Sequence, residues 1–177
     1  MALIDEIRGK ISAEQFEFSK HAVDQSIIRR ISVQEIREIF GDAEVIEDYP
    51  EDKYGPSCLI LGKTGEGRPL HIQCSYPSRP LVKIITLYEP GSRPVDRFQK
   101  TENVMKDKEE KLVERRVTYT LEHEGKFYIV ENVPARVNEE TGEQFFSPVT
   151  VEQLQRMILT PGKPNRVIQT PVYEYAE

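Results

Sequence analysis

The chain has 177 residues and a formal net charge of −6, with 38% hydrophobic and 31% charged residues. This composition is typical of a globular protein with a polar surface, and no apolar run approaches the roughly 20 residues that span a bilayer. Residues 1–93 contain 12 Lys and Arg against 15 Asp and Glu, and residues 94–177 contain the same numbers, so each part carries −3. This even distribution disfavours a general nucleic-acid binder, which usually has a basic stripe. The acidic start is unlike a targeting signal, so we expect a cytoplasmic protein.

Helical spacing of apolar residues predicts three helices near the N-terminus. The expected ranges are 2–13, 20–30 and 32–40, and residues 16–19 are either a short strand or the approach to the second helix. Ser32 and Glu35 form a capping box that starts the third helix, which Gly41 ends.

Four β-branched and aromatic runs, separated by Gly- and Pro-rich turns, predict strands over residues 43–49, 57–61, 70–76 and 81–88. Helices followed by a meander define an α+β fold. We expect N-terminal helices packed on a four-stranded, mainly antiparallel sheet, in a domain that spans residues 1–93.

Residues 94–111 are predicted to be a charged linker, because this stretch has few apolar residues. Alternation over 113–121 and 127–133 predicts a hairpin with Gly125 in its turn. A helix over 148–159 completes a small β-hairpin-plus-helix domain at 112–177. The segment 167–175 is interrupted by Pro171, so it is expected to be an edge strand or a docking arm.

His71 is the most informative residue of the chain, because it lies in the middle of a predicted strand. Leu70 and Ile72 alternate with His71 and Gln73, so the two sets should lie on opposite faces of the sheet. His71 is either a functional group or a partly buried histidine bonded to a neighbouring backbone or carboxylate group.

The two cysteines, Cys58 and Cys74, form no CxxC pair and are expected to be buried reduced thiols rather than metal ligands. The geometry of neighbouring strands allows a disulfide between these cysteines, but the reducing cytosol disfavours it. We expect no cofactor and no bound metal.

Several motifs recur in order over residues 15–92: Lys20-His-Ala22, Arg29-Arg-Ile-Ser32, Tyr49-Pro-Glu-Asp52, Arg68-Pro-Leu-His71 and Ile85-Thr-Leu-Tyr-Glu-Pro90. Together they resemble a small bacterial and archaeal domain of unknown function that is grouped with the RelE-like and BrnT-like toxin ribonucleases. One departure is Gln25, whose position is often arginine in that family.

A second set of motifs follows: Val117-Thr-Tyr-Thr120, Glu131-Asn-Val-Pro-Ala135, Gly142-Glu143, Phe145-Phe-Ser147 and Pro171-Val-Tyr173. Through them residues 105–175 resemble the YgiT/MqsA-type zinc-finger antitoxins, in which two CxxC pairs bind zinc. Here the second pair falls at Asn138 and Thr141 and the first within 107–110, so all four thiolates are absent. The resemblance therefore implies a degenerate zinc finger without zinc.

The ribonuclease resemblance implies a base, an acid and a positive charge at the scissile phosphate. His21 and His71 suit the proton transfers, and Arg29 suits the phosphate. Tyr88 and Thr86 are expected to orient that phosphate. The alternatives stay open: His21 as a cap of its own helix turn, and Arg29, like Arg30, as a surface ion pair. His123 is expected at the solvated surface, and Asp48 and Asp52 are expected to be turn residues.

Two functions follow from these resemblances. The first is a fused toxin–antitoxin-type protein, with an endoribonuclease-like N-terminal domain that acts on RNA and is contacted by its own antitoxin-like domain. The second is a catalytically inactive module that binds a partner, or a second copy through the C-terminal arm. The acidic run 107–110 is either a solvated linker or a cover over arginines of the first domain. A DNA-binding repressor is a third option, and no membrane partner is expected.

Overall fold

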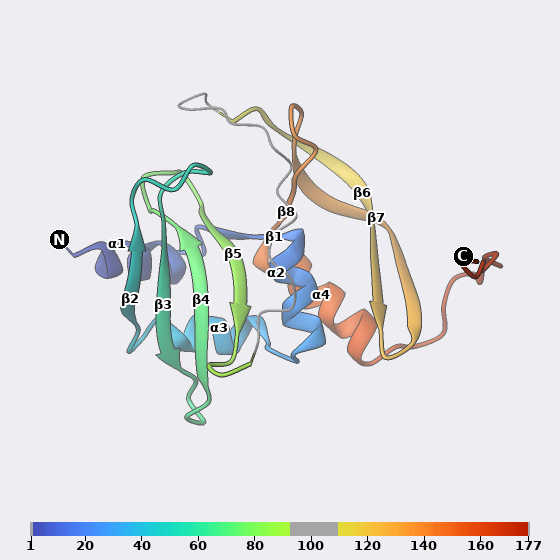
Figure 1. Cartoon of the computed structure of the whole chain (residues 1–177), viewed down its shortest axis with the longest axis horizontal. Helices are drawn as coiled ribbons and strands as arrows, with labels where there is room; N and C mark the ends of the chain where they lie inside the picture. Colours follow the sequence, from blue (N-terminus) through green and yellow to red (C-terminus); the bar gives the residue numbers. More distant parts are fainter. Residues whose placement is uncertain (1, 93–109, 177) are drawn as a thin grey trace.

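The computed structural model of the protein describes residues 2–92 and 110–176 (Figure 1). Its elements, in chain order, are α1 (Leu3–Ser12), β1 (Phe16–Ser19), α2 (Lys20–Ile28), α3 (Val33–Ile39), β2 (Glu44–Tyr49), β3 (Ser57–Lys63), β4 (Pro69–Ser75), β5 (Val82–Tyr88), β6 (Leu112–His123), β7 (Lys126–Asn138), β8 (Gln144–Phe146) and α4 (Pro148–Leu159). The helices and strands expected between residues 2 and 159 are therefore present. Of the predicted linker 94–111, residues 94–109 lie outside the described part of the chain.

All the strands belong to one eight-stranded mixed sheet in the order β2-β3-β4-β5-β1-β8-β7-β6. The expected fold class, a four-stranded and mainly antiparallel sheet followed by a small hairpin-plus-helix domain, is therefore wrong. The reason is β1, which pairs in parallel with β5 along one edge and antiparallel with β8 along the other. This short strand joins the N-terminal strands to the C-terminal hairpin in one sheet.

The helices pack on the sheet around a single hydrophobic core. Side chains of α1, α2 and α3 meet the inward residues of β1, β3, β4 and β5 in this core. Phe146, Val151, Leu154 and Ile158, from the C-terminal part, belong to the same cluster and are at most 2% exposed. Figure 1 shows α2 and α4 between the strands β2–β5 and the β6–β7 hairpin.

Serine caps fix where three of the helices begin. Ser19 accepts a hydrogen bond from the backbone N–H of Ala22, and Ser147 accepts one from Thr150. The predicted capping box is confirmed: Glu35 N–H donates to Ser32 Oγ at 3.1 Å, and Ser32 N–H donates to the Glu35 carboxylate at 2.8 Å. The Ser19 cap makes α2 follow β1 without a loop, which sets the position of His21.

Across residues 2–92 and 110–176, the helices are all too short or too polar to cross a bilayer.

Candidate functional site

His71 and Tyr88 are partners across β4 and β5, with ring centroids 5.1 Å apart in an edge-on arrangement. Leu70 and Ile72 are fully buried in the core, so His71 lies on the opposite face of the sheet, as the sequence predicts. Thr86 is paired with Gln73 on the same two strands. Burial, together with the negative charge of Glu47, raises the pKa of Tyr88, so its hydroxyl remains protonated at neutral pH.

The imidazole of His71 has an unusual environment. Its Nδ1 atom is buried and has no hydrogen-bond partner within the described residues. The bonded histidine that was the alternative interpretation is therefore not observed at this nitrogen. An unpaired buried nitrogen lowers the stability of a protein, and a catalytic role is one of the explanations for such a group. Nε2 of His123 is in the same state within the described residues.

His21 and Arg29 lie about two turns apart on α2, with Gln25 between them on the same stripe. Arg29 Nε donates to Gln25 Oε1 at 3.0 Å, and Arg29 Nη1 donates to Ser92 Oγ at 2.9 Å. Gln25, the departure from the family motif, thus positions the arginine. Burial lowers the pKa of His21, and Lys20 and Arg29 lower it further against the opposite effect of Asp24. At neutral pH His21 is therefore uncharged, as a general base requires.

The four predicted site residues thus form two pairs, His71 with Tyr88 and His21 with Arg29. The ring contact of the first pair lies between β4 and β5, and the hydrogen bonds of Arg29 run to Gln25 and Ser92. His71 and Tyr88 lie on the face of the sheet opposite to the core in which α2 packs.

Arg68 links the two strands to the end of α2. Its guanidinium donates to the carbonyl oxygens of Arg29 at 2.9 Å and Arg30 at 3.1 Å, and it pairs with Glu89 and with Glu35. It therefore satisfies carbonyl groups at the C-terminus of α2 and ties them to the end of β5. Sequence reasoning included Arg68 only as a motif residue. The available signal was that Arg68 and Glu89 flank strands expected to be neighbours.

The C-terminal part of the chain contacts α2 next to His21. Tyr119 of β6 donates its hydroxyl proton to Asp24, and Lys20 donates to the carbonyl of Thr120 at 3.2 Å. Further along the helix, Gln155 of α4 donates to Ser26 Oγ at 3.1 Å, in a buried contact. Both the hairpin and α4 therefore hold the helix that carries His21 and Arg29.

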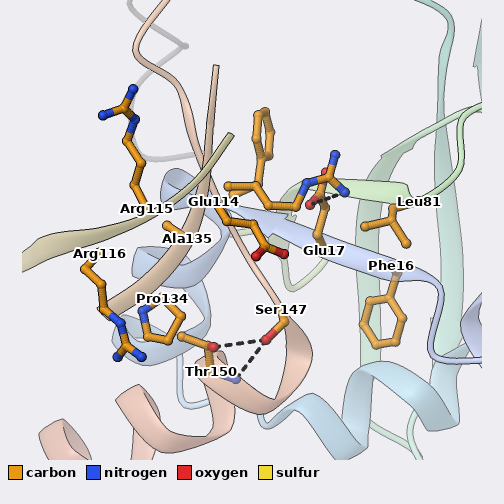
Figure 2. Close-up of a pocket in the computed structure, with 12 residues that line it drawn as sticks. Phe16, Glu17, Leu81, Glu114, Arg115, Arg116, Pro134, Ala135, Ser147 and Thr150 are labelled. Atoms are coloured by element: carbon orange, nitrogen blue, oxygen red, sulfur yellow. Dashed lines mark hydrogen bonds and ion pairs between the residues drawn. The ribbon is translucent and has the colours of Figure 1, made fainter. Parts of the chain in front are cut away.

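A cavity of about 500 Å³ lies where β1 meets the C-terminal strands and the start of α4 (Figure 2). Its lining residues are Phe16, Glu17, Leu81, Glu114, Arg115, Arg116, Pro134, Ala135, Arg136, Phe145, Ser147 and Thr150. Glu17 is 2% exposed and lies 3.5 Å from Arg136. Burial raises the pKa of Glu17, although Arg136 and Lys83 act in the opposite direction.

Near this cavity, Glu110 forms ion pairs with Lys83 and, at 2.7 Å, with Arg79. Lys83 is 8% exposed, and its ammonium group lies 4.0 Å from the centre of the Phe145 ring. Burial lowers the pKa of this lysine. Glu110 is the one residue of the predicted acidic run 107–110 that falls in the described chain. It contacts Arg79 rather than the arginines beside the candidate site.

The loop at residues 138–142 is closed by hydrogen bonds. Asn138, which is 6% exposed, accepts bonds through Oδ1 from the backbone of Glu140 at 2.9 Å and of Thr141 at 3.2 Å. Gly142, at φ 77°, donates to the carbonyl of Asn138 at 2.8 Å. In the described part of the chain, no group of three or more His, Cys, Asp or Glu side chains is arranged to hold a metal. An Asx turn at Asn138 therefore closes this loop.

The expectations for the remaining residues have outcomes that differ from one another. The placement of His123 at the solvated surface is wrong, because this side chain is only 8% exposed. The tip of the hairpin that carries it lies against Arg30, which pairs with Glu124 at 3.5 Å. Cys58 and Cys74 are buried free thiols, as predicted, with their sulfur atoms 3.9 Å apart. Asp48 and Asp52 accept hydrogen bonds from Tyr76 and from the backbone of Tyr54, which are roles in local structure.

Comparison with known proteins gives one match. A family model described as a domain of unknown function (DUF4258) matches residues 18–89, from the end of β1 to the end of β5. His21, Arg29, His71 and Tyr88 all fall within the matched region. No curated protein and no solved structure matches the chain significantly.

Proposed function

We propose that this is a fused toxin–antitoxin-type protein, in which a ribonuclease-like N-terminal part is kept inactive by its own C-terminal part. The observation that carries the proposal is the set of contacts on α2. The hairpin and α4 form hydrogen bonds with Lys20, Asp24 and Ser26, which lie on the same helix as His21. We place this activity in the cytoplasm, where RNA substrates occur.

The proposed chemistry assigns a role to each member of the two pairs. Uncharged His21 accepts the proton of the 2′-hydroxyl, His71 donates a proton to the leaving 5′-oxygen, and Arg29 stabilises the charge on the phosphate. The protonated hydroxyl of Tyr88 orients that phosphate. Cleavage requires both pairs to contact one phosphate. Because His71 and Tyr88 lie on the face of the sheet opposite to the core in which α2 packs, α2 must move relative to β4 and β5 before this contact can form. The contacts from Tyr119 and Gln155 oppose this movement.

Weakening those contacts in the full-length chain tests the proposal. In the double variant Tyr119→Phe and Gln155→Ala, both bonds to α2 are lost while the chain stays complete. We expect expression of this variant to arrest the growth of a bacterial host, and expression of wild type to leave growth unchanged. Adding His71→Ala or His21→Ala to the double variant should restore growth. A soluble double variant that leaves growth unaffected would count against a toxin.

The matched control is the double variant Tyr128→Phe and Gln153→Ala. It makes the same chemical changes on β7 and α4, where Gln153 is exposed. It should behave as wild type, because neither side chain has a hydrogen bond to α2 in the described chain.

A second candidate function is a catalytically inactive interaction module. The shared core favours it, since Phe146, Val151, Leu154 and Ile158 pack with residues of the N-terminal part. Release of the C-terminal part would expose this core, so a permanent complex is the simpler state. This alternative predicts that neither the double variant nor any of its derivatives affects growth.

A further inference from the structure

The chain ends in an extended arm that leaves the body of the protein. Residues 160–176 contain neither helix nor strand, and the predicted edge strand at 167–175 is not formed (Figure 1). Within residues 166–170 the arm exposes two large apolar side chains, Val167 at 85% and Ile168 at 50%. Apolar side chains gathered at this level of exposure mark a segment that binds another surface.

The strand β2 offers an edge that fits such a segment. It is the terminal strand of the sheet, and within the described residues it pairs with β3 alone. Most of its residues are exposed, including Ile46 at 38% and Tyr49 at 37%. Its outer N–H and C=O groups are therefore accessible to an additional strand.

Charge selects which strand can add to this edge. β2 and the turn after it carry the acidic residues Glu44, Glu47, Asp48, Glu51 and Asp52. Two copies of β2 would repel each other, and so would an acidic strand. In the arm, residues 160–171 include Lys163 and Arg166 and no acidic residue. Arg166 pairs with the exposed Glu131 of β7 within one copy, and the proposed contact replaces this partner with carboxylates of β2. The edge strand β6 is less suitable, because it presents the arginines Arg115 and Arg116.

The sequence of the arm also suits a short strand. Residues 166–170 read Arg-Val-Ile-Gln-Thr, which favours an extended chain, and Pro171 ends the segment. This length is close to that of β2, which has six residues. Proline outside the paired residues removes no ladder hydrogen bond.

We propose that residues 166–170 of one copy add as an extra strand to β2 of a second copy of the chain. The arm and β2 lie at opposite ends of the molecule in Figure 1, so the contact is head-to-tail. A contact of this kind forms open chains or rings whose mass rises with protein concentration. The proposal concerns assembly, and it holds whether or not the protein cleaves RNA.

Light scattering of the full-length protein over a concentration series tests the proposal. We expect the mass to rise above that of one chain, and to rise less at high salt. Ile168→Pro, which removes a backbone donor from the exposed arm, should return the protein to a monomer. Tyr175→Ala, in the same arm but outside the proposed strand, should leave the assembly unchanged.

A charge exchange identifies the acceptor edge. Lys163→Glu with Arg166→Glu should weaken association about tenfold or more, because like charges then face each other. Adding Glu44→Lys and Glu47→Lys on β2 should restore it. A protein that remains a monomer at the highest concentration would overturn the proposal. So would an assembly that persists in Ile168→Pro, or a charge reversal on the arm that β2 lysines fail to rescue.

Discussion

Gln155 in α4 donates a hydrogen bond of 2.8 Å to the carbonyl oxygen of Ile31, in the buried turn that follows α2. The same amide donates to Ser26 within α2. One side chain of the C-terminal part therefore satisfies two polar groups buried in the N-terminal part. The contact links the end of the chain to the helix that carries His21, and it makes the C-terminal part a component of the fold.

The substitution Gln155→Ala should lower the free energy of unfolding by about 2 kcal/mol, because it leaves a buried carbonyl without a donor. Chemical denaturation of the purified variant measures this loss. Gln153→Ala is the matched control: it changes the same residue type at an exposed position of the same helix, and it should lie within about 0.5 kcal/mol of wild type. Equal stability of the two variants would contradict the structural role of Gln155.

Tyr119→Phe removes the hydroxyl that donates to Asp24 while it keeps the ring against Phe146. Burial, with a further contribution from Asp24, raises the pKa of Tyr119, so the hydroxyl is protonated throughout the accessible pH range. We expect a loss of about 1–2 kcal/mol, since bonds to charged groups are the stronger ones and Asp24 keeps its pair with Lys20. Thermal unfolding checks this, and Tyr128→Phe should show a smaller effect.

His71→Leu should leave stability unchanged within about 1 kcal/mol or raise it, because the buried Nδ1 has no hydrogen-bond partner in the described chain. Leu70→Ala, the adjacent residue on the core face of β4, should instead cost about 2–5 kcal/mol. A large loss of stability in His71→Leu would show that the imidazole supports the fold, and the functional interpretation would lose its main support.

Glu17 gives a prediction about pH. Because burial raises its pKa above the ordinary value of 4.5, the folded state holds the proton more tightly than the unfolded state. Stability from this group is therefore greatest at low pH and declines as the pH rises through its folded-state pKa. Glu17→Gln should remove this decline and raise the melting temperature at neutral pH.

Glu14 is the control for Glu17, because its pKa is shifted in the opposite direction. A hydrogen bond from Arg37 lowers its pKa, so its contribution is present at neutral pH and is lost as the pH falls. Glu14→Gln should lower the melting temperature slightly at neutral pH. The melting temperature of each variant is measured against pH. If both substitutions change its pH dependence in the same direction, burial is not the dominant effect on the pKa of Glu17.

The local features of this fold could be predicted from the sequence, because neighbouring residues determine them. The capping box of Ser32 and Glu35, the alternation around His71 and the hairpin turn at Gly125 are of this kind. The pairing of Phe18 with Phe146 joins distant parts of the chain, and a four-residue strand has too little periodicity to predict it. Together with the parallel pairing of β1 and β5, it changes the expected four-stranded sheet into an eight-stranded one.

In the candidate site, too, some features could be predicted from neighbouring residues and others depend on distant contacts. The face of His71 followed from strand alternation, and the order of the strands placed Tyr88 on the neighbouring strand, whereas the register that pairs the two residues comes from the structure. The role of Arg68 and the burial of His123 depend on contacts with residues far away in the sequence, at the end of α2 and at Arg30. No local pattern contains that information.

Cleavage of a labelled single-stranded RNA by the purified full-length protein tests the central claim most directly. Wild type, the Tyr119→Phe and Gln155→Ala double variant, and the same variant with His71→Ala are compared, each confirmed as folded by circular dichroism. The account predicts cleavage by the double variant, at least tenfold less by wild type, and none after His71→Ala. A folded double variant that leaves the RNA intact, or cleavage that survives His71→Ala, would contradict it.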